Sequence, residues 1–337
     1  MLLKEYRILV PMTLDEFQRG AKFNAIDEAE QTHPEDLKVE ASVLPTIKEE
    51  IFIGRCLLPD VPLSSGKMTH RLPQEYQPPH SKLPWYMRLF TPKSKTEVHI
   101  ERWDAWPYRK VRITNPGYLK QDGYLLFEVM HIENDLGKQE NVFCLTPPLL
   151  EKREVINCDI LDTSGLDEED LSPETDPKVF RSLKANRGPL REGWEKNPEI
   201  PHTAMYCVLN VHFKMDGLQE LAENLLHDII PTLLVLQCRE IFCSMDRWYD
   251  MNLEEVSAYE AEAKRRAKAV AKRKLSQRSA SRRSQMSERT YSQSTRTVED
   301  PQDGKDPTLD QDLQREPLRS LQQTPAARRP LISATAI

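Results

Sequence analysis

The sequence has little glycine, only 11 residues in 337. None of them forms a GxGxxG or GxxxxGK[ST] pattern, so the loops that cradle nucleotide phosphates are missing. The patterns HExxH and GxSxG, which mark zinc proteases and serine hydrolases, are absent as well. No catalytic motif remains, and we expect the protein not to be an enzyme.

Cysteine and histidine are present but not in metal-binding arrangements. The six cysteines form no CxxC pair and no zinc-like spacing with histidine. The eight histidines are scattered singly, and we interpret them, including His131 and His212 in predicted strands, as surface or structural residues. Charged residues interrupt the N-terminal apolar stretch, so we expect no secretion signal and reduced thiols. We predict no metal and no cofactor.

Long hydrophobic runs are also missing. The longest, near Ile229–Leu236, contains Pro231 and Thr232 and is too short to span a bilayer. We therefore expect a soluble, cytoplasmic protein.

Aromatic residues are almost absent from the last 77 positions, where only Tyr291 remains of 24 in the chain. Residues 261–337 carry 17 basic against 9 acidic side chains, whereas residues 1–260 carry 30 against 44. Without large apolar side chains this tail cannot offset the entropy lost on folding. We predict a globular domain at 1–262 and, at 263–337, a basic and then Ser- and Pro-rich disordered tail.

Turn-forming residues separate short β-prone segments in the first part of the chain, a spacing typical of a meandering antiparallel sheet. Residues 205–215 alternate most clearly, with Cys207 and Leu209 on one face and Tyr206 and Asn210 on the other. The predicted strands are 2–10, 50–56, 97–102, 109–113, 124–132, 155–161 and 205–215, with an edge strand allowed within 30–50.

Two capping boxes predict helix starts. Thr13 with Glu16 begins a helix through about Asn24, and Asn252 with Glu255 begins one that runs into a basic end. Between them, a leucine-rich pattern from 218 to 245 predicts a long helix kinked at Pro231. A Pro- and charge-rich loop covers 162–200, a length typical of functional loops. These elements predict an α+β domain that can enclose a cavity.

The basic segment 264–274 has three interpretations: a solvated helix end, attraction to an anionic membrane, and nuclear targeting or nucleic-acid binding. It contains no aromatic side chain for base stacking, so we expect no nucleic-acid partner. Ser284, after two arginines, resembles a substrate of basophilic kinases. Phosphorylation there would weaken membrane attraction and could be read by a phosphoserine-binding adaptor.

Eight stretches together resemble the phosphatidylinositol transfer protein family, in the family's order and over about residues 1–260. Two of them, PLREGW and RWYDM, are most similar to its soluble, cytoplasmic retinal-degeneration-B-type branch. The stretches are LLKEYRILVP, LDEFQRG, SKLPWYMRLFTP, WDAWPYRKVRITN, DLGKQENV, DPKVFRSLKANRGPLREGW, FKMDGLQ and RWYDMNLEEV.

The resemblance implies a helix-grip fold related to START domains. There, a concave, mainly antiparallel sheet and long helices enclose one phospholipid as cargo, and a C-terminal helix and an exchange loop form the gate. It also implies headgroup contacts at Thr69, Arg71, Asp104 and Glu260, of which only Thr69 and Glu260 match the family residue. Arg71 stands in place of Lys, and Asp104 in place of Asn.

At the family's phosphate-binding positions this sequence departs further from the family pattern. These positions fall on Ala21, Val111, Val129 and Cys207, none of which binds phosphate well. Arg109 shares a strand face with Val111 and could supply a replacement cation; a solvated arginine is the alternative. The family's aromatic membrane-docking pair falls on Met215 and Asp216. Trp85 and Tyr86 lie in another docking region and either take over this role or belong to the core.

Two functions follow from these residues. The first is a monomeric carrier that moves phosphatidylinositol, or phosphatidic acid, between membranes through transient contact with them. The second is an interaction protein that keeps the fold without headgroup-specific transfer, with a cavity that is empty, collapsed or filled with neutral lipid. The retained inositol contacts favour the first.

Overall fold

A computed structural model describes residues 2–32, 47–51, 67–76, 91–117, 123–166, 171–212, 219–270 and 272–273. Within these ranges lies one eight-stranded sheet, in the order β2-β3-β4-β5-β6-β8-β1-β7. The strands are β1 Leu2–Val10, β2 Ile47–Ile51, β3 Lys67–Tyr76, β4 Val98–Ala105, β5 Tyr108–Thr114, β6 Tyr124–Glu133, β7 Glu154–Cys158 and β8 Thr203–His212.

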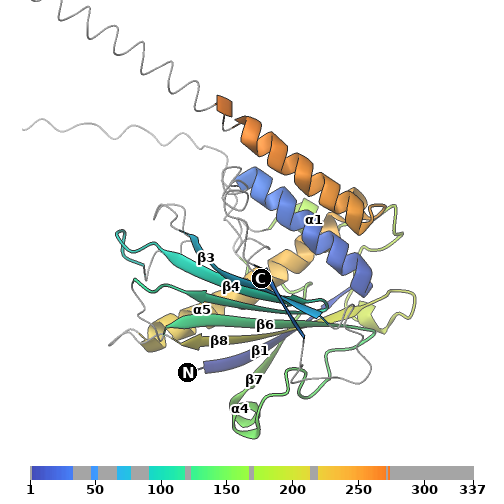
Figure 1. Cartoon of the computed structure of the whole chain (residues 1–337). Helices are drawn as coiled ribbons and strands as arrows, with labels where there is room; N and C mark the ends of the chain where they lie inside the picture. Colours follow the sequence, from blue (N-terminus) through green and yellow to red (C-terminus); the bar gives the residue numbers. More distant parts are fainter. Residues whose placement is uncertain are drawn as a thin grey trace, which may run out of the picture.

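Helices cover the concave side of this sheet (Figure 1). They are α1 Leu14–Thr32, α5 Gln219–Cys243 and the short α6 Met245–Trp248, while α4 Pro147–Lys152 lies beside β7. A further helix over residues 253–270, here named the C-terminal helix, packs beside α1. None of the helices within the described ranges has both the length and the apolar character that crossing a membrane requires.

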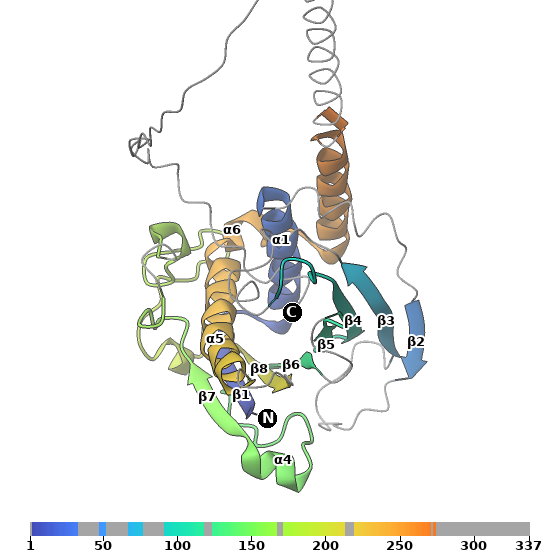
Figure 2. The same ribbon diagram turned by 90° about the vertical axis from the view of Figure 1, so that its left-hand side faces the viewer.

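The sheet is antiparallel throughout except for the pairing of β1 with β7, which is parallel. Strands β2 to β6 meander in chain order, and β8 then inserts between β6 and β1. Figure 2 shows the curved sheet wrapping around α1. The predicted α+β class and the concave, mainly antiparallel sheet are therefore confirmed.

Strand β3 is the one strand of the described sheet that the residue pattern did not predict. Pro73 lies in its middle, and a proline there removes a donor from the strand ladder. The structure accommodates it with a shift of register between Arg71 and Gln74 against β4. An irregularity of this kind depends on the neighbouring strand, so local sequence does not reveal it.

Helix α1 begins as predicted but extends beyond the predicted end near Asn24. The capping box is formed: the backbone N–H of Glu16 donates to Thr13 Oγ1 at 3.2 Å, and that of Thr13 donates to Glu16 Oε2 at 2.8 Å. The last turns, through Thr32, are held by Glu30, which accepts from Arg266 at 2.6 and 2.8 Å. That partner is more than 200 residues away, so the extension could not be read locally.

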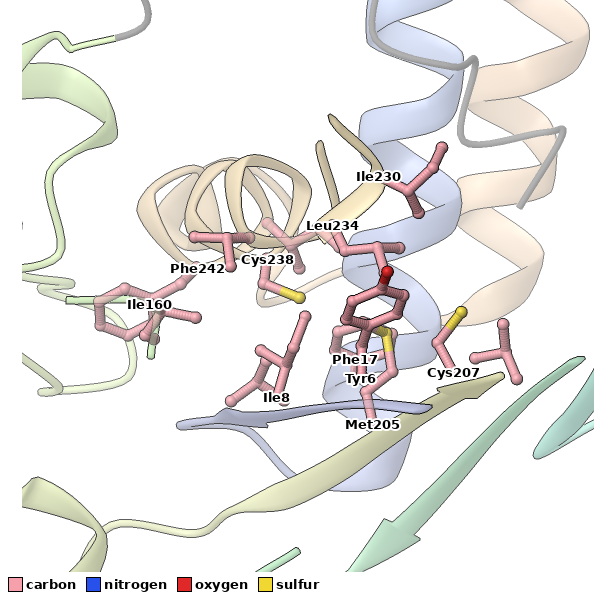
Figure 3. Close-up of a cluster of buried hydrophobic side chains, with 14 of the residues drawn as sticks. Tyr6, Ile8, Phe17, Ile160, Met205, Cys207, Ile230, Leu234, Cys238 and Phe242 are labelled. Atoms are coloured by element: carbon pink, nitrogen blue, oxygen red, sulfur yellow. The ribbon is translucent and has the colours of Figure 1, made fainter. Parts of the chain in front are cut away.

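The core lies between the concave face of the sheet and α5, and Figure 3 shows its centre. Alternation in β1 and β8 turns Tyr6, Ile8, Met205 and Cys207 toward the helix, as the pattern predicts for β8. Helix α5 packs against them with a row of apolar side chains that includes Ile230, Leu234, Cys238 and Phe242. Helix α5 continues through Pro231. The five cysteines within the described ranges are free thiols.

The outer face of β1 and β8 is buried too, which alternation alone did not indicate. Tyr206 and Val208 pack there against Val142 and Phe143 of the segment after β6. Glu5 is fully buried on β1 and is neutralised by Arg7 at 2.7 Å and Arg153 at 2.8 Å. A buried carboxylate requires such partners.

The long loop predicted over 162–200 is a packed segment where the structure describes it. Two short 3₁₀ helices, Pro173–Thr175 and Trp194–Lys196, interrupt it. Arg187 crosses to α1, donating to Glu16 Oε2 at 2.8 Å and to the carbonyl of Pro11 at 2.9 Å. Both side chains of this ion pair are buried, so loss of either partner would leave an uncompensated buried charge where the segment meets the start of α1.

Candidate functional site

A cavity of about 460 Å³ lies between α1, the sheet and the C-terminal helix. This volume is within the range of ligand-binding pockets in proteins. Its apolar lining includes Phe17, Ala25, Ile26, Val129 and Met205. The cavity is therefore open space with an apolar wall, and the collapsed interior considered for a non-binding relative is not observed.

Four of the five predicted headgroup residues line this one cavity: Thr69, Asp104, Arg109 and Glu260. Strand pairing brings three of them together, because Thr69 is opposite Asp104 and Asp104 is opposite Arg109. The Nε of Arg109 donates to Asp104 Oδ1 at 2.7 Å. Glu260 reaches the same space from the C-terminal helix, far along the chain.

The charges of the cavity favour an anionic ligand. Glu260 pairs with Lys264 at 2.7 Å and lies 3.9 Å from the Nζ of Lys22. Three cationic side chains line the cavity, Lys22, Arg102 and Arg109, against the two carboxylates of Asp104 and Glu260. An excess of positive charge in a partly enclosed site attracts phosphate.

The four positions that lost phosphate-binding residues divide into two groups. Ala21 and Val129 line the cavity and present only methyl groups to it. Val111 and Cys207 lie in the adjoining core, where burial raises the pKa of the Cys207 thiol and keeps it neutral. None of the four side chains can neutralise a phosphate. Arg109 lines the cavity as the proposed replacement requires, and its contact with phosphate remains a prediction.

The remaining predicted site residues are not described at the side-chain level. The backbone of Arg71 lies in β3, opposite Ile47 and Arg102, but its side chain is outside the described residues. Two other predictions fall outside the described ranges: the docking residues Trp85, Tyr86 and Met215, and the phosphorylation site Ser284. Of the predicted tail at 263–337, residues 263–270 are described and continue the C-terminal helix, and nothing is described beyond residue 273.

The cavity residues that the sequence analysis missed include three with basic side chains: Lys22, Arg102 and His131. Strand alternation could have found two of them, because Arg102 shares a face with Asp104 and His131 shares a face with Val129. Lys22 adjoins Ala21 on α1, but only the position of the C-terminal helix places its amine near Glu260. Its Nζ also donates to Ser257 Oγ at 2.7 Å.

Comparison with known proteins identifies the family. The family model described as "Phosphatidylinositol transfer protein" matches residues 1–265. The chain is 28% identical over 277 residues to the human phosphatidylinositol transfer protein beta isoform, covering 81% of this chain and 96% of that protein. It is 30% identical over 266 residues to phosphatidylinositol transfer protein 1 of Dictyostelium discoideum, covering 78% and 93%.

A larger relative is similar over much of the chain as well. The chain is 30% identical over 311 residues to the mouse membrane-associated phosphatidylinositol transfer protein 2, which covers 89% of this chain but 21% of that protein. The match to the family model spans most of the sequence and the whole of the described fold up to residue 265. This chain therefore belongs to the phosphatidylinositol transfer protein family.

Proposed function

We propose that this protein encloses one phospholipid in its cavity and transfers it between membranes, with an inositol lipid as its preferred cargo. The observation that carries this proposal is the convergence of Thr69, Asp104, Arg109 and Glu260 on one cavity. The relatives named as phosphatidylinositol transfer proteins support the same activity.

The chemistry of the site suits an inositol headgroup better than a bare phosphate. Inositol hydroxyls can donate to the carboxylates of Asp104 and Glu260, while the phosphate lies among Lys22, Arg102 and Arg109. Phosphatidic acid would bring the greater negative charge of a phosphate monoester and no inositol hydroxyls, and both carboxylates would then repel it. Headgroup selection therefore rests on hydrogen bonds that the wrong lipid leaves unmade.

Transfer needs a transient contact with a membrane and no chemical reaction. Enclosing the acyl chains gains about 0.8 kcal/mol per CH₂ removed from water. Exposed basic side chains at the end of the C-terminal helix, Arg265 and Lys268 among them, supply attraction to an anionic surface. In this proposal the protein works as a cytoplasmic monomer, the lipid is cargo rather than cofactor, and an adaptor that reads phosphorylated Ser284 regulates the tail.

The test is to purify the full-length chain from cells and identify bound lipid by mass spectrometry. We expect stoichiometric inositol phospholipid, reduced about tenfold in Glu260→Ala because an inositol hydroxyl loses its charged partner. The matched control is Glu254→Ala, an exposed carboxylate on the same helix, which should leave lipid occupancy unchanged. A folded wild-type protein without phospholipid would favour the interaction protein instead.

A further inference from the structure

Residues 178–191, here named the basic turn, differ in charge from the rest of the globular domain. The segment KVFRSLKANRGPLR contains five basic residues and no acidic one, whereas residues 1–260 carry 30 basic against 44 acidic side chains. Four of the five basic side chains are exposed: Lys178, Arg181, Lys184 and Arg191. The segment therefore concentrates positive charge on the surface of an acidic domain.

Hydrogen bonds fix the shape of the basic turn. Ser182 and Arg187 form an antiparallel bridge, with N–H···O distances of 2.8 and 3.2 Å in the two directions. The carboxylate of Asp246 in α6 accepts from the backbone N–H of Leu183 at 3.0 Å and from that of Lys184 at 3.2 Å. The tip of the turn is thus held in place by its backbone, and the side chains at the tip do not contribute to this support.

The apolar side chains of the basic turn divide into two groups. Phe180 and Leu190 anchor the segment: the ring of Phe180 packs edge-on against Phe242 with centroids 5.4 Å apart, and Leu190 is 1% exposed. By contrast, Val179 is 59% exposed and Leu183 is 81% exposed, the highest value among the exposed large hydrophobic residues of the described ranges. Single exposed apolar residues are common on protein surfaces, but here two lie on one fixed turn among cations.

The positive charge of the turn is available to a ligand. The Nη2 of Arg181 donates to the side-chain oxygen of Asn186 at 3.3 Å, and the Nη1 of Arg191 donates to the carbonyl oxygen of Lys178 at 3.1 Å. Both acceptors are uncharged, so these contacts orient the two guanidinium groups without neutralising them. The surface thus combines an exposed leucine with oriented cations.

The position of the turn connects it with the cavity. The Nζ of Lys184 pairs with Asp250 at 2.6 Å, in the connection between α6 and the C-terminal helix. The C-terminal helix begins at Leu253, three residues after Asp250, and Leu253 lines the cavity. A surface bound at the basic turn therefore lies beside the start of the helix that closes the cavity.

We propose that the basic turn docks the protein on anionic membranes, with Leu183 inserted among the lipid headgroups and the exposed cations in contact with lipid phosphates. Two aliphatic side chains on a tight turn are few for a protein interface, which needs about 800 Å² from each partner. Interfacial membrane binding, in contrast, gains from each inserted apolar side chain and from each nearby cation. The inference rests on the proposed carrier function, which requires contact with a bilayer.

The test measures co-sedimentation of the full-length protein with phosphatidylcholine vesicles that contain or lack phosphatidylserine. Leu183→Ser removes the inserted side chain and keeps the charges, and it leaves the core intact because Leu183 is so exposed. We expect the affinity for the phosphatidylserine vesicles to fall about three- to tenfold in this variant. Arg181→Gln removes one charge and keeps the leucine, and the affinity should fall about two- to fivefold.

A matched control makes the same replacement elsewhere on the surface. Leu136 is 41% exposed and lies in the segment that follows β6. Leu136→Ser removes an exposed leucine outside the basic turn and should bind the vesicles like the wild type. An equal loss of affinity in Leu136→Ser and Leu183→Ser would overturn the inference, because the effect would then not belong to the turn.

The remaining outcomes separate docking from the carrier function. A wild-type protein without affinity for the anionic vesicles, or a Leu183→Ser variant that binds them like the wild type, overturns the docking site. Bound lipid, measured by mass spectrometry on the same preparations, should be unchanged in Leu183→Ser because Leu183 does not line the cavity. Absence of phospholipid from a wild-type protein whose vesicle binding still depends on Leu183 overturns the carrier function and leaves the docking site standing.

Discussion

At the scale of single residues, His131 couples folding to pH because, over a wide range of pH, its ring is charged in the unfolded chain and neutral in the native protein. Its pKa is about 4 in the fold, against a usual value of 6.5. Between these values the unfolded chain binds more protons than the native protein, so stability rises with pH. The part of the free energy of unfolding that depends on the neutral ring is fully present above about pH 6.5 and is lost as the pH falls toward 4.

We predict that the free energy of unfolding falls by about 2 kcal/mol from about pH 7 to about pH 5 because of this residue. Urea titrations at the two pH values measure the fall in the wild-type protein and in His131→Phe. The variant should show a smaller pH dependence by that amount. Equal pH dependence in the wild type and His131→Phe would show that the native imidazole binds its proton as readily as the unfolded one, so that burial does not lower its pKa.

Site residues could be predicted from the sequence only where a family pattern marked them. Thr69 and Glu260 carry the family residue, and Asp104 and Arg109 occupy recognisable positions. His131 matched no such pattern, and its importance comes from the ring stacking of Phe17 and the carbonyl of Pro107, which tertiary structure brings to it. Chemistry that depends on such neighbours is invisible along the chain.

At the scale of elements, α1, α5 and α6 meet at Gly20. A Cβ built on Gly20 would lie 2.6 Å from the indole of Trp248 and 2.8 Å from Ile241. The indole cannot move aside easily, because it is fully buried and its Nε1 donates to Ser244 Oγ at 3.0 Å. Glycine at this position therefore allows the close approach of the helices.

We predict that Gly20→Ala destabilises the protein by about 1–3 kcal/mol, the usual range for overpacking a filled core. In an exposed helix the same change would stabilise by up to about 1 kcal/mol, so the sign of the effect tests the packing. Chemical denaturation measures it. Gly165→Ala is the control, because its added methyl meets Thr232 at 3.7 Å and should be tolerated. A gain of stability in Gly20→Ala would contradict the packing shown here.

Local signals predicted most elements but few of their limits. Capping boxes and alternation located the start of α1 and the faces of β8, since both arise from neighbouring residues. Local signals failed where contacts with distant residues determine the extent of an element. Arg266 holds the last turns of α1, and β3 accommodates Pro73 by its irregular pairing with β4. The parallel pairing of β7 with β1 likewise joins segments about 150 residues apart.

At the scale of the whole molecule, the C-terminal helix closes one wall of the cavity, to which it contributes Leu253 and Glu260. It is held against α1 by the stacked rings of Phe23 and Tyr259, with centroids 5.0 Å apart, and by the pair of Arg266 with Glu30. The arginine also lowers the pKa of Glu30, so this pair remains charged under ordinary conditions. A lipid that leaves through this wall must first separate these contacts.

We predict that Arg266→Gln speeds the release of phosphatidylinositol to acceptor vesicles about two- to fivefold, because a partly exposed ion pair adds modestly to the closed state. Fluorescent lipid transfer from the loaded protein measures the rate. Arg265→Gln is the matched control: it removes the same charge from the adjacent, exposed position, and with it any attraction to the vesicle surface. If membrane attraction dominates, both variants slow transfer alike. Faster transfer in Arg266→Gln alone shows that opening of the C-terminal helix limits the rate.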